Sequence, residues 1–241
     1  ASPALAALRD ALVLLRLHVG LPDCDVLVSS AEAFGVAGLA DVPPPAWGRF
    51  PVLAQARVRG SPSGRGAILI PWWAYLSLDW SRRYVARLRD RAPPTPWSNR
   101  SDSLFWRGSD SGCLLPPPGA AASCAAWGPS SWAAFPRVKL VRWSSRRSAR
   151  VDALFTGTLH EEVREFACGE GLCDGRLAPP ELLQQHRFAA YVDGTSHSDR
   201  MLLLLNSGAT ILHMASRIDV HVSAALRAAR ATLPVRGDAS D

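Results

Sequence analysis

The sequence predicts an α/β fold with parallel sheets. Apolar stretches of strand length alternate along the chain with segments of helical spacing, the pattern that βαβ units produce. The clearest unit runs from residue 186 to residue 213, where a buried strand stops at a glycine-containing polar turn, a helix follows and a second apolar strand returns. The 241 residues are enough to bury a sizeable core, as one large domain or two small ones.

The elements follow from periodicity and from the residues that end them. Apolar residues at helical spacing predict a helix at 4–19, and two prolines, Pro93 and Pro94, end an arginine-rich helix at 78–91. A turn-forming segment at 60–66 separates two strands. Strands are predicted at 25–29, 51–58, 67–70, 103–109, 151–155, 188–192 and 209–212, and further helices at 137–148, after the turn at 193–196, and in the Arg/Ala-rich segment near the C-terminus.

Two connections are predicted to be long. Residues 113–136 are dense in Pro, Ala, Gly and Ser, which is typical of a surface insertion. Residues 156–180 are acidic and glycine-rich and are predicted to form a long connection. No internal repeat is visible, so the chain is not a solenoid.

The composition favours a globular protein with an acidic partner. The net charge of +6 and the pI of about 9.5 fit a partner that carries phosphate. Arginine supplies most of this charge and is spread along the chain, and GC-rich coding would produce the same bias. Because no basic helix, zinc finger or aromatic RNA-binding signature is visible, nucleic acid is not expected as a partner.

Cysteine usage and one sequon lean towards a lumenal protein. Cys168 and Cys173 flank a glycine-rich turn and are placed to close a small disulfide loop, whereas the five cysteines lack zinc-ribbon spacing, so no metal is expected. Asn99 begins a glycosylation sequon. No segment is long and apolar enough to span a membrane. Because the sequence begins at Ala1, any targeting or anchoring segment is expected upstream of it.

The turn at 193–196 is the strongest local candidate for a binding site. A strand that stops at a glycine turn and opens a helix points free backbone N–H groups at one spot, which suits a phosphate. Arg200, about one turn into the predicted helix, would add a forked positive charge. An ordinary βαβ unit with a polar loop remains the alternative.

Four blocks, in chain order, resemble the CAP10-like glycosyltransferases (glycosyltransferase family 90), which include the lumenal protein O-glucosyltransferases. The blocks are an apolar run ending in Pro and Trp at 68–73, the Leu-Phe-Trp-Arg-Gly-Ser segment at 104–109, the helix and strand at 137–155, and the unit at 186–213. The resemblance extends over roughly residues 25–213.

The resemblance implies a GT-B-like fold of two Rossmann-like lobes with the donor site in the cleft, here incomplete at both ends. Residues 1–100 would form the acceptor-side lobe and residues 101–241 the nucleotide-sugar lobe. The implied activity moves a sugar, glucose or xylose, from a UDP-sugar to a protein or glycan hydroxyl, without a cofactor or metal, in the lumen of the endoplasmic reticulum or Golgi.

The resemblance also implies roles for particular residues. Arg137 and Arg200 would bind the diphosphate, and Ser109 would hydrogen-bond the donor. The backbone and side chains of the turn would cradle the nucleotide, through Thr195, Ser196, His197, Ser198 and Asp199. The alternatives are solvated surface arginines and a serine that only forms a turn.

The catalytic base departs from the family pattern. The family has an Asp after its first strand, at the position of Ala33 here, so Glu32, one residue earlier, is the candidate base, with Asp41 as a second choice. A non-catalytic binding module that keeps the sugar site is therefore the alternative function.

Other residues of catalytic type have plainer interpretations. His186 and His213 flank or lie within buried strands and are interpreted as structural. The aromatic residues of the segment after residue 70 would form an acceptor platform or pack in the core; they are Trp72, Trp73, Tyr75 and Trp80.

Overall fold

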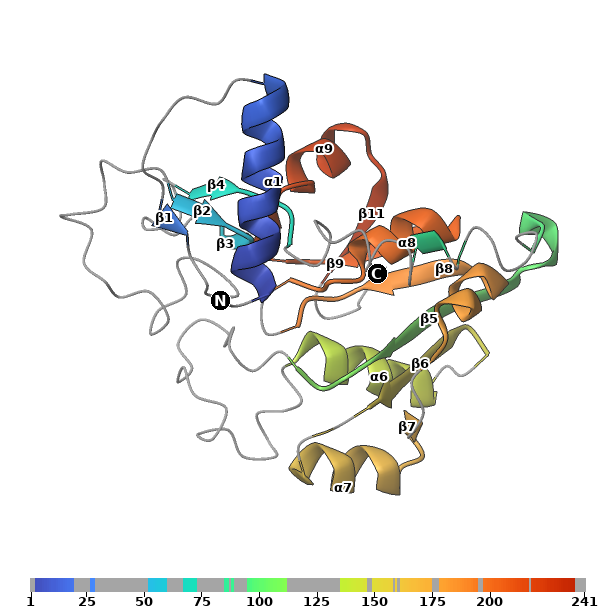
Figure 1. Ribbon diagram of the computed structural model, residues 1–241. Helices are drawn as coiled ribbons and strands as arrows, with labels where there is room; N and C mark the ends of the chain where they lie inside the picture. Colours follow the sequence, from blue (N-terminus) through green and yellow to red (C-terminus); the bar gives the residue numbers. More distant parts are fainter. Residues whose placement is uncertain are drawn as a thin grey trace.

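The computed structural model describes residues 3–19, 27–28, 52–59, 67–72, 85–86, 88, 95–111, 135–146, 149–157, 159, 161–174, 178–194, 197–216 and 218–236. Within these residues the chain is α/β, as predicted, and its centre is a six-stranded parallel sheet flanked by helices (Figure 1).

The central sheet consists of six parallel strands. Its strands are β5 (Ser101–Gly108), β6 (Val151–Thr156), β7 (Cys173–Asp174), β8 (His186–Tyr191), β9 (Thr210–Met214) and β11 (Thr232–Val235). They lie in the order β11-β9-β8-β5-β6-β7, and every neighbouring pair is parallel. Numbered along the chain this is 3-2-1-4-5-6, the Rossmann order, and its direction reverses between β5 and β8.

Helices cover both faces of this sheet (Figure 1). Successive residues of a strand point to opposite faces, and in β5 Trp106 packs with α6 (Pro136–Arg146) and α7 (Glu161–Gly169). Phe105 points the other way, into a core with α8 (Met201–Ser207) and the 3-10 helix η5 (Pro180–Gln185). Leu226, in α9 (Ser223–Ala228), packs against this second core. Another 3-10 helix, η3 (Trp97–Asn99), precedes β5.

The N-terminal part contributes a smaller parallel sheet. Helix α1 (Pro3–Val19) is followed by β1 (Leu27–Val28), β2 (Val52–Ala54) and β4 (Ala67–Leu69), which pair in parallel in the order β1-β2-β4. The strand predicted at 51–58 is divided at Gln55. Its second half, β3 (Ala56–Val58), instead pairs antiparallel with β10 (Ile218–Val220) from the C-terminal part.

Three predictions about the elements need correction. The connection at 156–180 contains α7 and β7, because Val163 and Ala167, one turn apart, are both buried. Helix α8 begins at Met201, so Arg200 is its N-cap residue rather than one turn inside it. Strand β11 was not predicted, and it pairs in parallel with β9 at the edge of the sheet.

The other predictions about helices, strands and the disulfide are confirmed or lie outside the described residues. Cys168 and Cys173 form the predicted disulfide, which joins the end of α7 to β7. The predicted insertion lies outside the described residues, except that Phe135 is buried and Pro136 begins α6. Of the helix predicted at 78–91, the structure describes only 85, 86 and 88. No helix within the described ranges combines the length and apolar character that crossing a membrane requires.

A buried carboxylate holds β3 and β10 together. The Asp219 side chain is 7% exposed and lies 2.8 Å from Arg59, 2.8 Å from Arg227 and 3.8 Å from Arg57. Burial alone would raise the pKa of Asp219, but the hydrogen bonds and charges of Arg59 and Arg227 outweigh it and hold the pKa below its ordinary value of 3.8. Asp219 therefore links the two parts of the chain electrostatically.

Replacing Asp219 with asparagine is expected to lower the free energy of unfolding at pH 7 by about 1–2 kcal/mol, since two of the arginines are half exposed and screened by solvent. This contribution is present above the ordinary pKa and is lost as the pH falls through the lowered pKa. Urea unfolding at pH 7 and pH 3 measures the difference. Asp102→Asn, at a 74% exposed side chain 3.5 Å from Arg187, is the control and should change little. Equal loss in both variants would contradict this role.

Candidate functional site

A pocket of about 360 Å³ lies where the carboxyl ends of both parallel sheets meet. Ser109 follows β5 and Gly194 lies shortly after β8, on either side of the point where the order of the central sheet reverses. From the smaller sheet, Gln55 follows β2 and Trp72 lies shortly after β4. Ligands of open α/β sheets bind in the crevice at such a switch point.

Arg137 lines this pocket and joins the segments that follow β5 and β8. It lies in the first turn of α6 and is 8% exposed. Its Nε donates to the carbonyl of Asp193 (2.8 Å) and its Nη2 to that of Val192 (3.4 Å), while Nη1 donates to the carbonyl of Ser109 (2.9 Å) and to the hydroxyl of Ser111 (2.6 Å). Four of its five N–H groups are therefore used within the protein.

Arg200 lines the same pocket but differs from Arg137 in its hydrogen bonding. Its guanidinium forms no hydrogen bond or ion pair with any residue that the structure describes. It lies over the ring of Trp106, with Cζ 5.9 Å from the ring centroid, and the Cζ of Arg137 lies 5.7 Å from the same centroid. Trp106 is buried, so one indole carries both cations through cation–π contacts.

Gly108 makes this arrangement possible. A Cβ at this position would lie 2.5 Å from the six-membered ring of Trp106 and 3.0 Å from Nη1 of Arg200. A Cβ at Gly194 would similarly lie 2.6 Å from Nη2 of Arg137. The glycines at the ends of β5 and β8 thus leave room for the two guanidiniums.

The two arginines repel each other. Burial, and then the charge of Arg200, lower the pKa of Arg137 to about 10, although Asp193 and Asp199 act in the opposite direction. Burial also lowers the pKa of Arg200, again opposed by Asp199. A guanidinium keeps its proton in proteins, so the two arginines bring two positive charges into a partly desolvated pocket.

Two backbone N–H groups just before α8 already have hydrogen-bond partners within the protein. The Ser198 N–H donates to the hydroxyl of Tyr191 (3.1 Å), and the Arg200 N–H points to the hydroxyl of Ser198 (3.5 Å). Helix α8 has seven residues and no side-chain cap. Charge in the pocket therefore comes from guanidinium groups more than from a helix N-terminus.

The predicted site residues divide into two groups. The structure brings together in one pocket Trp72, Ser109, Arg137, His197, Ser198, Asp199 and Arg200. The others, Glu32, Asp41, Thr195, Ser196, Trp73, Tyr75 and Trp80, lie outside the described residues.

The two histidines interpreted as structural lie in strands and are not among the pocket residues. His186 stacks on Phe105 at 4.5 Å between ring centroids, and its Nδ1 lies 2.9 Å from the hydroxyl of Ser103. His213 packs edge-to-face on Tyr191 at 4.7 Å. Burial lowers the pKa of both, which favours neutral rings.

Sequence reasoning missed four residues of the site. Ser111 is recognisable only as a second hydroxyl after β5, and Gln55 as a polar residue that interrupts an apolar strand. Trp106 gave no signal beyond an aromatic residue in a strand. Asp193 directly precedes the glycine of the turn, and its Oδ2 accepts a hydrogen bond from Ser216, while its buried Oδ1 has no partner among the described residues.

Within the described part of the chain, no group of three or more His, Cys, Asp or Glu side chains is arranged to hold a metal ion. No protein-family model and no curated protein matches the chain. The resemblance to CAP10-like glycosyltransferases therefore rests on the four sequence blocks.

Proposed function

We propose that the chain is a CAP10-like glycosyltransferase that moves a sugar, glucose or xylose, from a UDP-sugar to a protein or glycan hydroxyl. The observation that carries this proposal is the pair of arginines at the switch point, Arg137 buried and Arg200 half-buried, of which the Arg200 guanidinium has no hydrogen bond or ion pair with a described residue. Two like charges held close together in a desolvated site favour an anion that offsets their repulsion. A diphosphate supplies such an anion.

The arrangement suits the electrostatics of the reaction. When the bond between the anomeric carbon and the diphosphate oxygen breaks, negative charge grows on the leaving diphosphate and must be stabilised. Arg200 has the free donors for a forked contact with phosphate oxygens. Arg137, already anchored to both strands, contributes its charge and its remaining N–H group. Glu32 remains the proposed base that accepts the proton of the acceptor hydroxyl.

A GT-B-like arrangement of two lobes is part of the proposal. Residues 1–100 would be the acceptor-side lobe and residues 101–241 the nucleotide-sugar lobe. The meeting of the carboxyl ends of β2 and β4 with those of β5 and β8 at one pocket supports it. Because β10 pairs with β3, the chain would pass from one lobe to the other more than once.

We further propose the lumen of the endoplasmic reticulum or Golgi as the compartment. The disulfide between Cys168 and Cys173 would persist in an oxidising environment. Asn99, the first residue of the sequon, is exposed in η3 and accessible to glycosylation.

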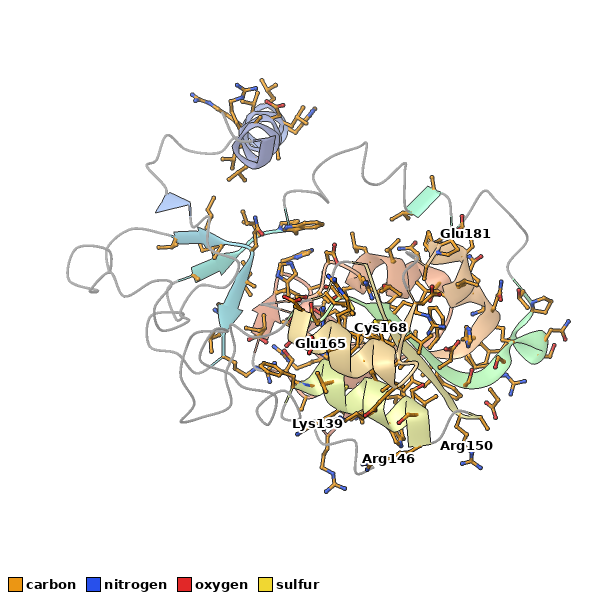
Figure 2. All side chains as sticks on the ribbon, turned by 90° about the horizontal axis from the view of Figure 1, so that it is seen from below. Lys139, Arg146, Arg150, Glu165, Cys168 and Glu181 are labelled. Atoms are coloured by element: carbon orange, nitrogen blue, oxygen red, sulfur yellow. A yellow bond between two sulfur atoms is a disulfide. The ribbon has the colours of Figure 1, made fainter. Side chains whose placement is uncertain are left out.

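Arg200→Ala is expected to weaken binding of UDP at least tenfold, because it removes the guanidinium with free donors while leaving the strands tied by Arg137. Calorimetric titration with UDP, with and without EDTA, measures this, and binding is expected to survive EDTA. Arg146→Ala is the matched control: Arg146 is exposed on the outer side of α6 (Figure 2) and should bind UDP as the wild type does. Unchanged affinity in Arg200→Ala would refute the assignment.

A non-catalytic sugar-binding module is the second candidate, favoured by Ala33 at the position where the family has its Asp. Both candidates bind UDP, so turnover separates them. Release of glucose from UDP-glucose that Glu32→Gln abolishes would establish the enzyme. Tight binding without turnover would favour the module.

A further inference from the structure

The pocket has two chemically different ends. One end carries Arg137 and Arg200 with the hydroxyl groups of Ser109 and Ser111, and the carboxylate of Asp199 offsets only part of its positive charge. The other end carries Gln55, Trp72 and His197. The cationic end can bind a phosphate. The other end offers aromatic rings and an amide, which a phosphate alone would not contact.

Gln55 presents an unused amide to the pocket. It lies at the break between β2 and β3, is half-buried, and its side chain forms no hydrogen bond with a described residue. An amide offers both a donor and an acceptor, so it can recognise a neutral group that carries both.

Trp72 and His197 form an uncharged corner next to this amide. Their ring centroids are 6.4 Å apart and their planes meet at 75°. Burial, with a smaller contribution from His221, lowers the pKa of His197 to about 4, against the effect of Asp199. His197 is therefore neutral at pH 7. A shallow recess continues from this corner between the apolar side chains of Met201, Leu202, Val220 and Val222.

We propose that Gln55, Trp72 and His197 bind a neutral ring with hydrogen-bonding groups, the organic part of a phosphate ester whose phosphate lies at Arg200. A sugar and a nucleobase share this chemistry: each has a face that packs on an indole and an edge that pairs with an amide. This inference rests on the proposed function, since it takes the cationic end as the phosphate site. It assigns ring recognition to the residues that follow β2 and β4 and phosphate recognition to those that follow β5 and β8.

The test compares ligands with and without a ring. Inorganic pyrophosphate, glucose 1-phosphate, UDP and UDP-glucose are titrated into the wild type, Trp72→Ala and Gln55→Leu. Trp72→Ala is expected to weaken UDP-glucose at least tenfold and Gln55→Leu about threefold to tenfold, while pyrophosphate affinity stays within twofold in both. Trp97→Ala, a matched substitution of a 46% exposed tryptophan in η3, should change no affinity. Two variants are used so that the test does not depend on one of them, whose loss of affinity could come from misfolding.

The probes also separate the two sources of the ring. Loss confined to glucose 1-phosphate and UDP-glucose supports a sugar, whereas equal loss for UDP and UDP-glucose with glucose 1-phosphate unchanged supports the base. The proposal is overturned if the two variants lose as much affinity for pyrophosphate as for the ligands with a ring. It is also overturned if their affinity changes for none of the probes. If the wild type still binds pyrophosphate and Arg200→Ala does not, the proposed function survives that failure. A wild type that binds none of the probes overturns both.

Discussion

Arg137→Met is expected to lower the free energy of unfolding by about 3–5 kcal/mol. Methionine fills most of the space of the arginine stem, but it leaves the carbonyls of Ser109, Val192 and Asp193 without their donor. These carbonyls belong to the ends of β5 and β8, which Arg137 joins at the switch point. A buried carbonyl without a donor keeps the full free-energy cost of its desolvation. That cost is larger than the net stabilisation that one hydrogen bond provides.

Urea unfolding followed by circular dichroism measures the effect of Arg137→Met. Arg146→Met, in the last turn of the same helix and exposed, is the control and is expected to stay within about 0.5 kcal/mol of the wild type. Arg137→Lys keeps the charge but has no planar fork to reach both strands, so it should recover only a minor part of the loss. Full recovery by lysine would contradict the argument from geometry.

Asp193→Asn is expected to change how stability depends on pH. Burial raises the pKa of Asp193 to about 7, although the hydrogen bond from Ser216 and the charges of Arg137 and Arg59 oppose the shift. Between the ordinary pKa of 3.8 and pH 7, the folded protein keeps a proton that the unfolded chain has released. Stability therefore falls as pH rises through this window. From pH 5 to pH 8 the Asp193 contribution should fall by roughly 2–3 kcal/mol, a change that the variant lacks.

The difference between wild type and Asp193→Asn isolates this effect. Histidines with lowered pKa values give the opposite slope: folding holds them neutral, so their contribution is lost as pH falls. These histidines are present in both proteins and cancel in the comparison. Thermal or urea unfolding from pH 5 to pH 8 should show that the stability of the variant rises relative to that of the wild type as the pH rises. A constant difference over this range would mean that Asp193 does not titrate there.

Local pattern predicted the strands of the central sheet well. The strands at 103–109, 151–155, 188–192 and 209–212 correspond to β5, β6, β8 and β9, because strands buried on both faces read as continuous apolar runs. Helix α7 and strand β11 were missed for opposite reasons. Acidic residues and glycines concealed the short apolar face of α7, and β11 contains Pro234 and has exposed side chains at Leu233 and Pro234.

The site was predictable only in part, because its residues are far apart in the sequence and are brought together by the order of the strands. Arg137, Ser109 and Arg200 were identified by resemblance, and the pocket brings them together. The partnership of Gln55 with them depends on how the smaller sheet meets the central one, which no local spacing encodes. Trp106 under both guanidiniums depends on the pleat of β5 and on the absence of a side chain at Gly108.

The pairing of β3 with β10 also has a consequence for the order of events during synthesis. Arg59 and Asp219, whose side chains form a hydrogen bond beside this pair, are 160 residues apart in the chain. While the protein is being translated, β3 leaves the ribosome long before its partner exists, and its edge stays open to other chains. Nascent chains that stop short of residue 218 should therefore need chaperones more than the finished protein does.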